Sequence, residues 1–183
     1  MLGQVFALVF VLTGATVAAA NRPQTLEVVP SVDLARYVGK WYEIARLPNK
    51  FQNKCAGEVM ATYSQLEGGE LKVVNECRLK DGQIDRAEGK ARLADKDGPN
   101  SKLEVRFAPA WLGWLPMVWG DYWIIDLAPD YSYSVVGTPD RKYLWILSRT
   151  PEMDEAVYKR IVEQTAARGF DVSRLIKTRQ SVE

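Results

Sequence analysis

From Pro30 to Thr150 the chain alternates apolar and polar residues over short stretches and shows no sustained helical period. The segment 102–108, Lys-Leu-Glu-Val-Arg-Phe-Ala, illustrates the pattern, with apolar side chains on one face and charged ones on the other. Turn-forming pairs such as Asp81-Gly82 separate these stretches. The pattern predicts strands at about 41–47, 57–65, 70–79, 84–93, 102–108, 120–127, 131–137 and 142–149.

Sequential strands joined by short turns predict antiparallel neighbours. An open sheet would leave two exposed edges, which closure into a barrel removes. We therefore expect an all-β fold, an eight-stranded antiparallel up-and-down barrel (calyx), in a single domain over residues 21–183.

The predicted strand 84–93 has unusually small inward residues, Ala87, Gly89 and Ala91. An eight-stranded barrel is either filled by its own side chains or left hollow for one small ligand. Small inward residues favour a hollow barrel. The alternative is that they accommodate large side chains, such as Phe107 or Trp145, from the opposite wall.

One helix is predicted at 152–168, after the strands. Thr150 suits the N-cap, Pro151 the first helical position, and Gly169 the C-terminal stop. Its apolar stripe comprises Met153, Val157 and Ile161. We expect this stripe to pack on the outside of the barrel, because the strands beneath it are apolar on both faces.

Residues Met1–Ala20 contain no charge, include an apolar run and end in Ala18-Ala19-Ala20. This is typical of a secretory signal peptide cleaved before Asn21, and the alternative is an N-terminal membrane anchor. Export predicts a periplasmic or secreted protein, peripheral to the outer membrane at most, in a compartment that permits disulfides.

Composition excludes several classes of function. Lys and Arg number 24 and Asp and Glu 23, with no basic run, which argues against nucleic-acid binding. Histidine is absent, so Ser-His and Cys-His catalysis and His-ligated metals are excluded. We predict no catalytic residue, metal or cofactor.

The two cysteines, Cys55 and Cys77, lie on the second and third predicted strands or at their edges. With a hairpin centred near Gly68 they are diagonal neighbours, and a bulge near Gly57 could bring the sulfurs together. The predicted disulfide would close roughly 20 residues and add about 3 kcal/mol. Two buried free thiols are the alternative.

The connection 108–119, which we call the Trp loop, has no charged residue. Such a loop at a cavity rim indicates a membrane-docking tip, a lid over a lipid, or a partner contact, unless it packs into the barrel mouth. The residues that we expect to make a membrane or partner contact are Trp111, Leu112, Trp114, Leu115 and Trp119.

Three motifs carry a family resemblance. The segment 39–45, Gly-Lys-Trp-Tyr-Glu-Ile-Ala, resembles the first signature of the lipocalins, Gly120-Asp121-Tyr122 the second, and Arg149 the third. Segments 143–150 and 169–173 are most similar to the bacterial outer-membrane lipocalins, whose branch includes plant temperature-induced lipocalins and apolipoprotein D. The lipid-modified cysteine of the bacterial members has no counterpart near the expected cleavage site. The structural signature residues are Gly39, Trp41, Asp121, Tyr122 and Arg149.

The resemblance implies that Trp41 lies at the closed end of the barrel with Arg149 across its face. A desolvated cation–π contact of this kind is worth about 1–2 kcal/mol. Residues 30–38 would cover the same end as a short helical turn.

The leading hypothesis is a carrier of one fatty acid or lysophospholipid. Tyr63, Asn75, Tyr122 or Tyr143 could orient its headgroup. The alternatives are a lipid-modifying enzyme that uses Cys77 or a tyrosine, and a protein-interaction scaffold that uses the Trp loop. The expected ligand-binding residues, inward by alternation, are Val59, Ala61, Tyr63, Val73, Asn75, Ala87, Gly89, Ala91, Val105, Phe107, Tyr122, Ile124, Val136, Tyr143 and Trp145.

Overall fold

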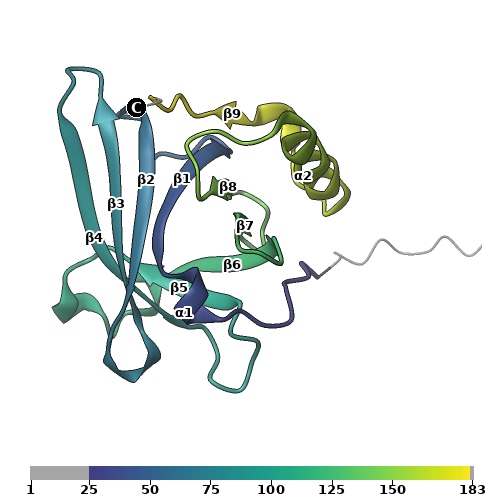
Figure 1. Cartoon of the computed structure of the whole chain (residues 1–183). Helices are drawn as coiled ribbons and strands as arrows, with labels where there is room; N and C mark the ends of the chain where they lie inside the picture. The colour runs from purple at the N-terminus through teal and green to yellow at the C-terminus, as the bar shows by residue number, and fades with distance from the viewer. Residues whose placement is uncertain (1–24, 182–183) are drawn as a thin grey trace, which may run out of the picture.

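The computed structural model describes residues 25–181 (Figure 1). The predicted signal peptide, Met1–Ala20, lies outside these residues. The strands are β1 (Gly39–Arg46), β2 (Cys55–Gln65), β3 (Leu71–Leu79), β4 (Ile84–Leu93), β5 (Lys102–Arg106), β6 (Gly120–Leu127), β7 (Tyr133–Gly137), β8 (Leu144–Ser148) and β9 (Ile176–Lys177). The helices are α1 (Leu34–Tyr37) and α2 (Glu155–Ala167), with 3-10 turns η1 (Glu67–Gly69), η2 (Ala110–Leu112), η3 (Pro116–Val118) and η4 (Val172–Arg174).

Strands β2 to β8 pair in sequence order, β8 pairs with β1, and β1 pairs with β2, so the sheet closes. These neighbouring strands all pair antiparallel, which confirms the predicted barrel. The short strand β9 was not predicted and extends the sheet beside β1. Within residues 25–181, no helix is long and apolar enough to cross a membrane.

The C-terminal segment closes a seam between β1 and β2. Direct pairing of these strands stops at Tyr42 and Met60. Beyond that level, the side-chain amide of Gln180 donates to the carbonyl oxygens of Glu43 (2.8 Å) and Val59 (2.9 Å). Gly57 lies under this segment, where an added Cβ would sit 2.6 Å from a backbone oxygen. The barrel wall is therefore completed by residues far away in sequence.

Helix α2 begins later than predicted. Its N-cap is Asp154, whose carboxylate accepts from the backbone N–H groups of Ala156 and Val157. The predicted N-cap Thr150 was wrong, and so was Pro151 as the first helical residue, because the Thr150 hydroxyl donates to the Glu152 carbonyl oxygen, in the turn before the helix. The helix end at Gly169, which has φ +87°, is confirmed.

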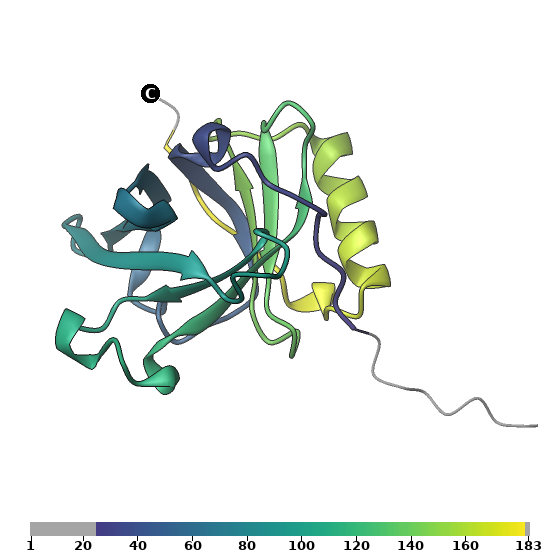
Figure 2. The same cartoon turned by 90° about the horizontal axis from the view of Figure 1, so that it is seen from below.

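Two hydrophobic clusters lie on opposite sides of the sheet. Helix α2 packs against the outside of the barrel, as predicted (Figure 2). Its cluster joins Ile161 to Ile125, Leu144 and Ile146 on the outward faces of the strands. The other cluster fills the closed end inside the barrel, where α1 covers it.

At the centre of the closed end lies Trp41, which is completely buried. The guanidinium carbon of Arg149 lies 3.7 Å from the centroid of its ring, so the expected contact is present. Arg149 also donates hydrogen bonds to the carbonyl oxygens of Arg36 (2.7 Å) and Lys40 (3.0 Å). One side chain thus ties α1 and the start of β1 to the end of β8.

Replacing Arg149 with lysine should destabilise the protein by about 2 kcal/mol. Lysine keeps the charge but cannot stack a planar group on Trp41 while donating to several carbonyl groups. Urea unfolding of Arg149→Lys measures the loss, with Arg174→Lys, at an exposed site, as the matched control. Equal stability of the two variants would contradict the assigned role of Arg149.

Candidate ligand-binding cavity

The barrel encloses a cavity of about 770 Å³, within the range of small-molecule sites. Phe51, Met117 and Asp140, from the β1–β2, β5–β6 and β7–β8 connections, line it near the open end. The barrel is therefore hollow, as predicted, although of the three small inward residues only Ala87 lines the cavity. Gly89 instead accommodates the Phe107 ring, as the alternative expected.

The wall contains most of the predicted lining residues. Those that contribute to it are Val59, Ala61, Tyr63, Val73, Asn75, Ala87, Val105, Phe107, Tyr122, Tyr143 and Trp145. Alternation therefore placed these side chains on the correct face.

Four predicted lining residues, Gly89, Ala91, Ile124 and Val136, are not on the wall. Ala91, Ile124 and Val136 belong to the closed-end cluster around Trp41, below the cavity floor. Gly89 is covered by the Phe107 ring, because an added Cβ would lie 2.8 Å from a ring carbon. The alternation of apolar and polar residues identifies the inward face of a strand, but not the depth at which the closed-end core begins.

Hydroxyl groups form a chain at the cavity floor. The Tyr122 hydroxyl lies 2.8 Å from that of Tyr63 and 3.0 Å from that of Tyr37, which in turn lies 3.0 Å from Ser134 Oγ. Burial raises the pKa of all three tyrosines. The floor is consequently neutral.

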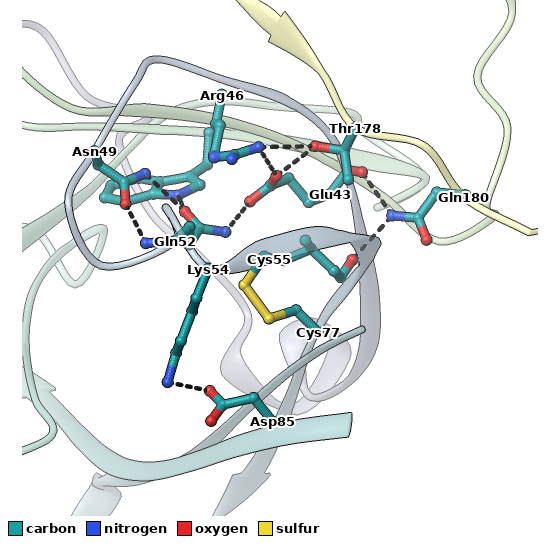
Figure 3. Close-up of a disulfide and its surroundings, with 12 residues drawn as sticks. Glu43, Arg46, Asn49, Gln52, Lys54, Cys55, Cys77, Asp85, Thr178 and Gln180 are labelled. Carbon is teal, nitrogen blue, oxygen red and sulfur yellow. Dashed lines mark hydrogen bonds and ion pairs between the residues drawn. A yellow bond between two sulfur atoms is a disulfide. The ribbon is translucent and has the colours of Figure 1, made fainter. Parts of the chain in front are cut away.

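Near the open end, a buried carboxylate organises the wall (Figure 3). Glu43 is 2% exposed and accepts hydrogen bonds from Arg46 Nη1 (3.1 Å), Gln52 Nε2 (2.5 Å) and the Thr178 hydroxyl. Gln52 Oε1 accepts from the Trp145 indole (3.0 Å). The network joins β1, the β1–β2 connection, β8 and the C-terminal segment. Alternation did not reveal it, because Gln52 and Thr178 come from segments outside the predicted strands.

Asn75 is the polar side chain in the middle of the wall. Its neighbours across the ladder, Ala61 and Ala87, are too small to cover it. Within the described part of the chain, its side-chain amide has no hydrogen-bond partner. It can therefore donate to or accept from a bound molecule.

Cys55 and Cys77 form a disulfide, with Cα atoms 5.7 Å apart (Figure 3). The β2–β3 register shifts at Gly57, as predicted. The bond brings β2 and β3 together beside the cavity, and both cysteines line it. A thiol nucleophile at Cys77 is therefore excluded, as are free buried thiols.

The Trp loop has an anchored base. The Trp119 ring lies 3.9 Å from the Arg92 guanidinium carbon, and its indole N–H donates to the Gly113 carbonyl (2.8 Å). Arg106 Nη1 donates to the carbonyls of Pro109 (3.1 Å) and Ala110 (3.0 Å). These contacts fix the loop against β4 and β5.

The tip of the Trp loop is exposed and projects away from α2 (Figure 2). Trp111 is 74% exposed, Trp114 78% and Met117 85%. Leu112 and Leu115 are half-buried, whereas Trp119 lines the cavity. The loop therefore lines the cavity at its two ends, through Ala108 and residues 117–119, whereas Trp111 and Trp114 do not line it.

Comparison with known proteins agrees with this geometry. The model of the Lipocalin-like domain matches residues 32–180. Temperature-induced lipocalin-1 of Arabidopsis thaliana is 43% identical over 157 residues, 85% of this chain and 83% of that protein. Outer membrane lipoprotein Blc of Escherichia coli K12 is 36% identical, over 86% of this chain and 85% of Blc. Insecticyanin of the tobacco hornworm Manduca sexta has the same fold, with a TM-score of 0.66, 24% identity and 86% of each chain covered.

The stability contributed by Glu43 should depend on pH. Burial raises the pKa of its carboxyl above the ordinary 4.5. The carboxyl is protonated in both states at lower pH, and as the pH rises it ionises first in the unfolded chain. Its stabilising contribution is therefore complete below pH 4.5 and is lost as the pH rises through the folded-state pKa.

Glu43→Gln cannot ionise, so its stability relative to the unmodified protein should increase from about pH 4 to pH 7. Urea unfolding across this range measures the difference. Glu67→Gln, at an exposed position, should show no such trend. A stability difference for Glu43→Gln that is independent of pH would rule out the raised pKa.

Proposed function

The chain belongs to the lipocalin-like family, and from this premise we propose that it binds and carries one fatty acid or lysophospholipid in the barrel. The cavity carries the proposal. Its wall is largely apolar, its floor is neutral, and it is open at one end. A ligand with an acyl chain and a polar head fits this distribution, because the chain leaves water while the head stays near the mouth.

We propose that the protein acts outside the cytoplasm, in the maintenance of envelope lipids. The Escherichia coli relative is named an outer membrane lipoprotein, and the disulfide suits an oxidising compartment. A carrier role is favoured over lipid-modifying catalysis. The chain contains no histidine, Cys77 is held in the disulfide, and the floor tyrosines stay protonated because burial raises their pKa.

Ala87→Phe should abolish ligand binding without unfolding the protein. Ala87 lines the cavity, and a benzyl group there would occupy space that an acyl chain needs. Titration of the delipidated protein with a lysophospholipid, followed by tryptophan fluorescence, measures the effect. Ala94→Phe, at an exposed residue beyond β4, places the same ring outside the cavity and should bind normally. Unchanged affinity in Ala87→Phe would place the ligand elsewhere.

We also propose that the Trp loop contacts membranes. Its exposed tryptophans and Met117 extend from an anchored base beside the open end, where a lipid would enter. Tryptophan is favoured at the membrane–water interface. Contact there would shorten the path of an acyl chain between bilayer and cavity.

The double variant Trp111→Ser/Trp114→Ser should bind phosphatidylcholine vesicles about tenfold more weakly in a flotation assay. Ile176→Ser removes an exposed apolar side chain on β9, distant in sequence from the loop, and should float normally. If the unmodified protein does not float with vesicles, the membrane role is wrong, and a protein partner becomes the better explanation of the exposed tip.

A further inference from the structure

The ionisable residues that line the cavity, apart from tyrosines and the bonded cysteines, are all acidic. Among the described residues that line the cavity, none is lysine or arginine. The acidic residues are Glu43, Glu76, Asp85, Asp121 and Asp140. The side chains of Glu76 and Asp121 alternate with inward neighbours and therefore face the outside of the barrel, Asp121 at its rim. A near-neutral chain could have placed either sign of charge there.

The cationic partners of these acids lie behind them. Lys54 pairs with Asp85 (2.7 Å) and Lys142 with Asp140 (3.0 Å), yet neither lysine contributes to the wall. Glu43 is likewise on the wall, whereas its partner Arg46 is not. In each pair the carboxylate is the member nearer to a bound molecule, so a ligand meets the negative end of the pair.

Asp121 is the acid least compensated by a cation. No ion pair joins it to another described residue. Burial, Glu104 and Asp140 raise the pKa of its carboxyl, and the latter two do so because they carry like charge. Negative potential thus accumulates at the rim between the Trp loop and the β7–β8 connection.

Aromatic side chains share the wall with these acids. Tyr143 and Trp145 line the cavity, and their rings stack with centroids 6.0 Å apart, whereas the Arg92 guanidinium already covers the face of Trp119. Aromatic faces attract ammonium groups and offer nothing comparable to a carboxylate. The rim therefore combines the two groups that favour a cation.

We propose that the cavity selects amphiphiles by the charge of the headgroup. It binds an amine or quaternary ammonium most tightly, a neutral head less tightly and a carboxylate least tightly. An anionic head would lose hydration without gaining a cation on the wall, and Asp121 and Asp140 would repel it. This selectivity rests on the proposed carrier function and specifies the headgroup class of its ligand.

The test uses three probes of equal chain length: tetradecyltrimethylammonium, monomyristoylglycerol and myristate. Each is titrated below its micelle concentration into delipidated protein and followed by tryptophan fluorescence. Ala87→Phe serves as the blank for binding outside the cavity. We expect affinity to fall in the stated order, by about tenfold between the cation and the anion. High salt should reduce that ratio, because the rim is open to solvent.

The double variant Asp121→Asn/Asp140→Asn should reduce the ratio of cation to anion affinity to within about twofold, since asparagine keeps the shape of the side chain and removes its charge. Asp97→Asn, at an exposed residue between β4 and β5, should leave it unchanged. If all three probes bind equally, or myristate binds best, charge selection is wrong while the carrier function stands. If none binds above the Ala87→Phe blank, the carrier function itself is wrong and the selectivity with it.

Discussion

The stacking of Arg149 on Trp41 is the contact on which the rest of the structure depends. Because the barrel encloses a cavity, its interior core is confined to the closed end, and that end must hold the strands together. One guanidinium, 3.7 Å from the indole ring and bonded to the carbonyls of α1 and β1, does this. With that end fixed, the closed-end cluster gives the cavity a floor, and the space above can remain empty.

Because the interior is hollow, other stabilising contacts lie on the outside of the sheet and where its strands meet. Helix α2 covers the outward apolar faces of the strands, where it builds a second core. The C-terminal segment bridges β1 and β2 where their direct pairing ends, and the Glu43 network joins that segment to the mouth. The disulfide holds β2 to β3 close by. The open end is therefore shaped by contacts that are distant in sequence.

The sequence alone predicted the features that follow local periodicity. The eight barrel strands, the stripe residues Val157 and Ile161 of α2, the stop at Gly169 and the bulge beside Cys55 are all present, whereas Met153 packs in the same cluster from before the helix. It did not predict how deep each inward residue would lie, because Ala91 and Ala87 look alike in an alternating pattern. Nor did it reveal the hydrogen-bond network of Glu43, the strand β9 or the cavity residues in loops, since contacts between residues distant in sequence position them. The cap at Asp154 was missed because two plausible caps lie close together.

The central claim is that the hollow barrel takes up one amphiphile along its apolar wall. Isothermal titration calorimetry of the delipidated protein with a lysophospholipid, repeated at several temperatures, tests it most directly. We predict one ligand per chain and a negative heat-capacity change, as expected when an acyl chain leaves water. Absence of saturable binding, a stoichiometry well above one ligand bound per chain, or a heat-capacity change near zero would contradict the account.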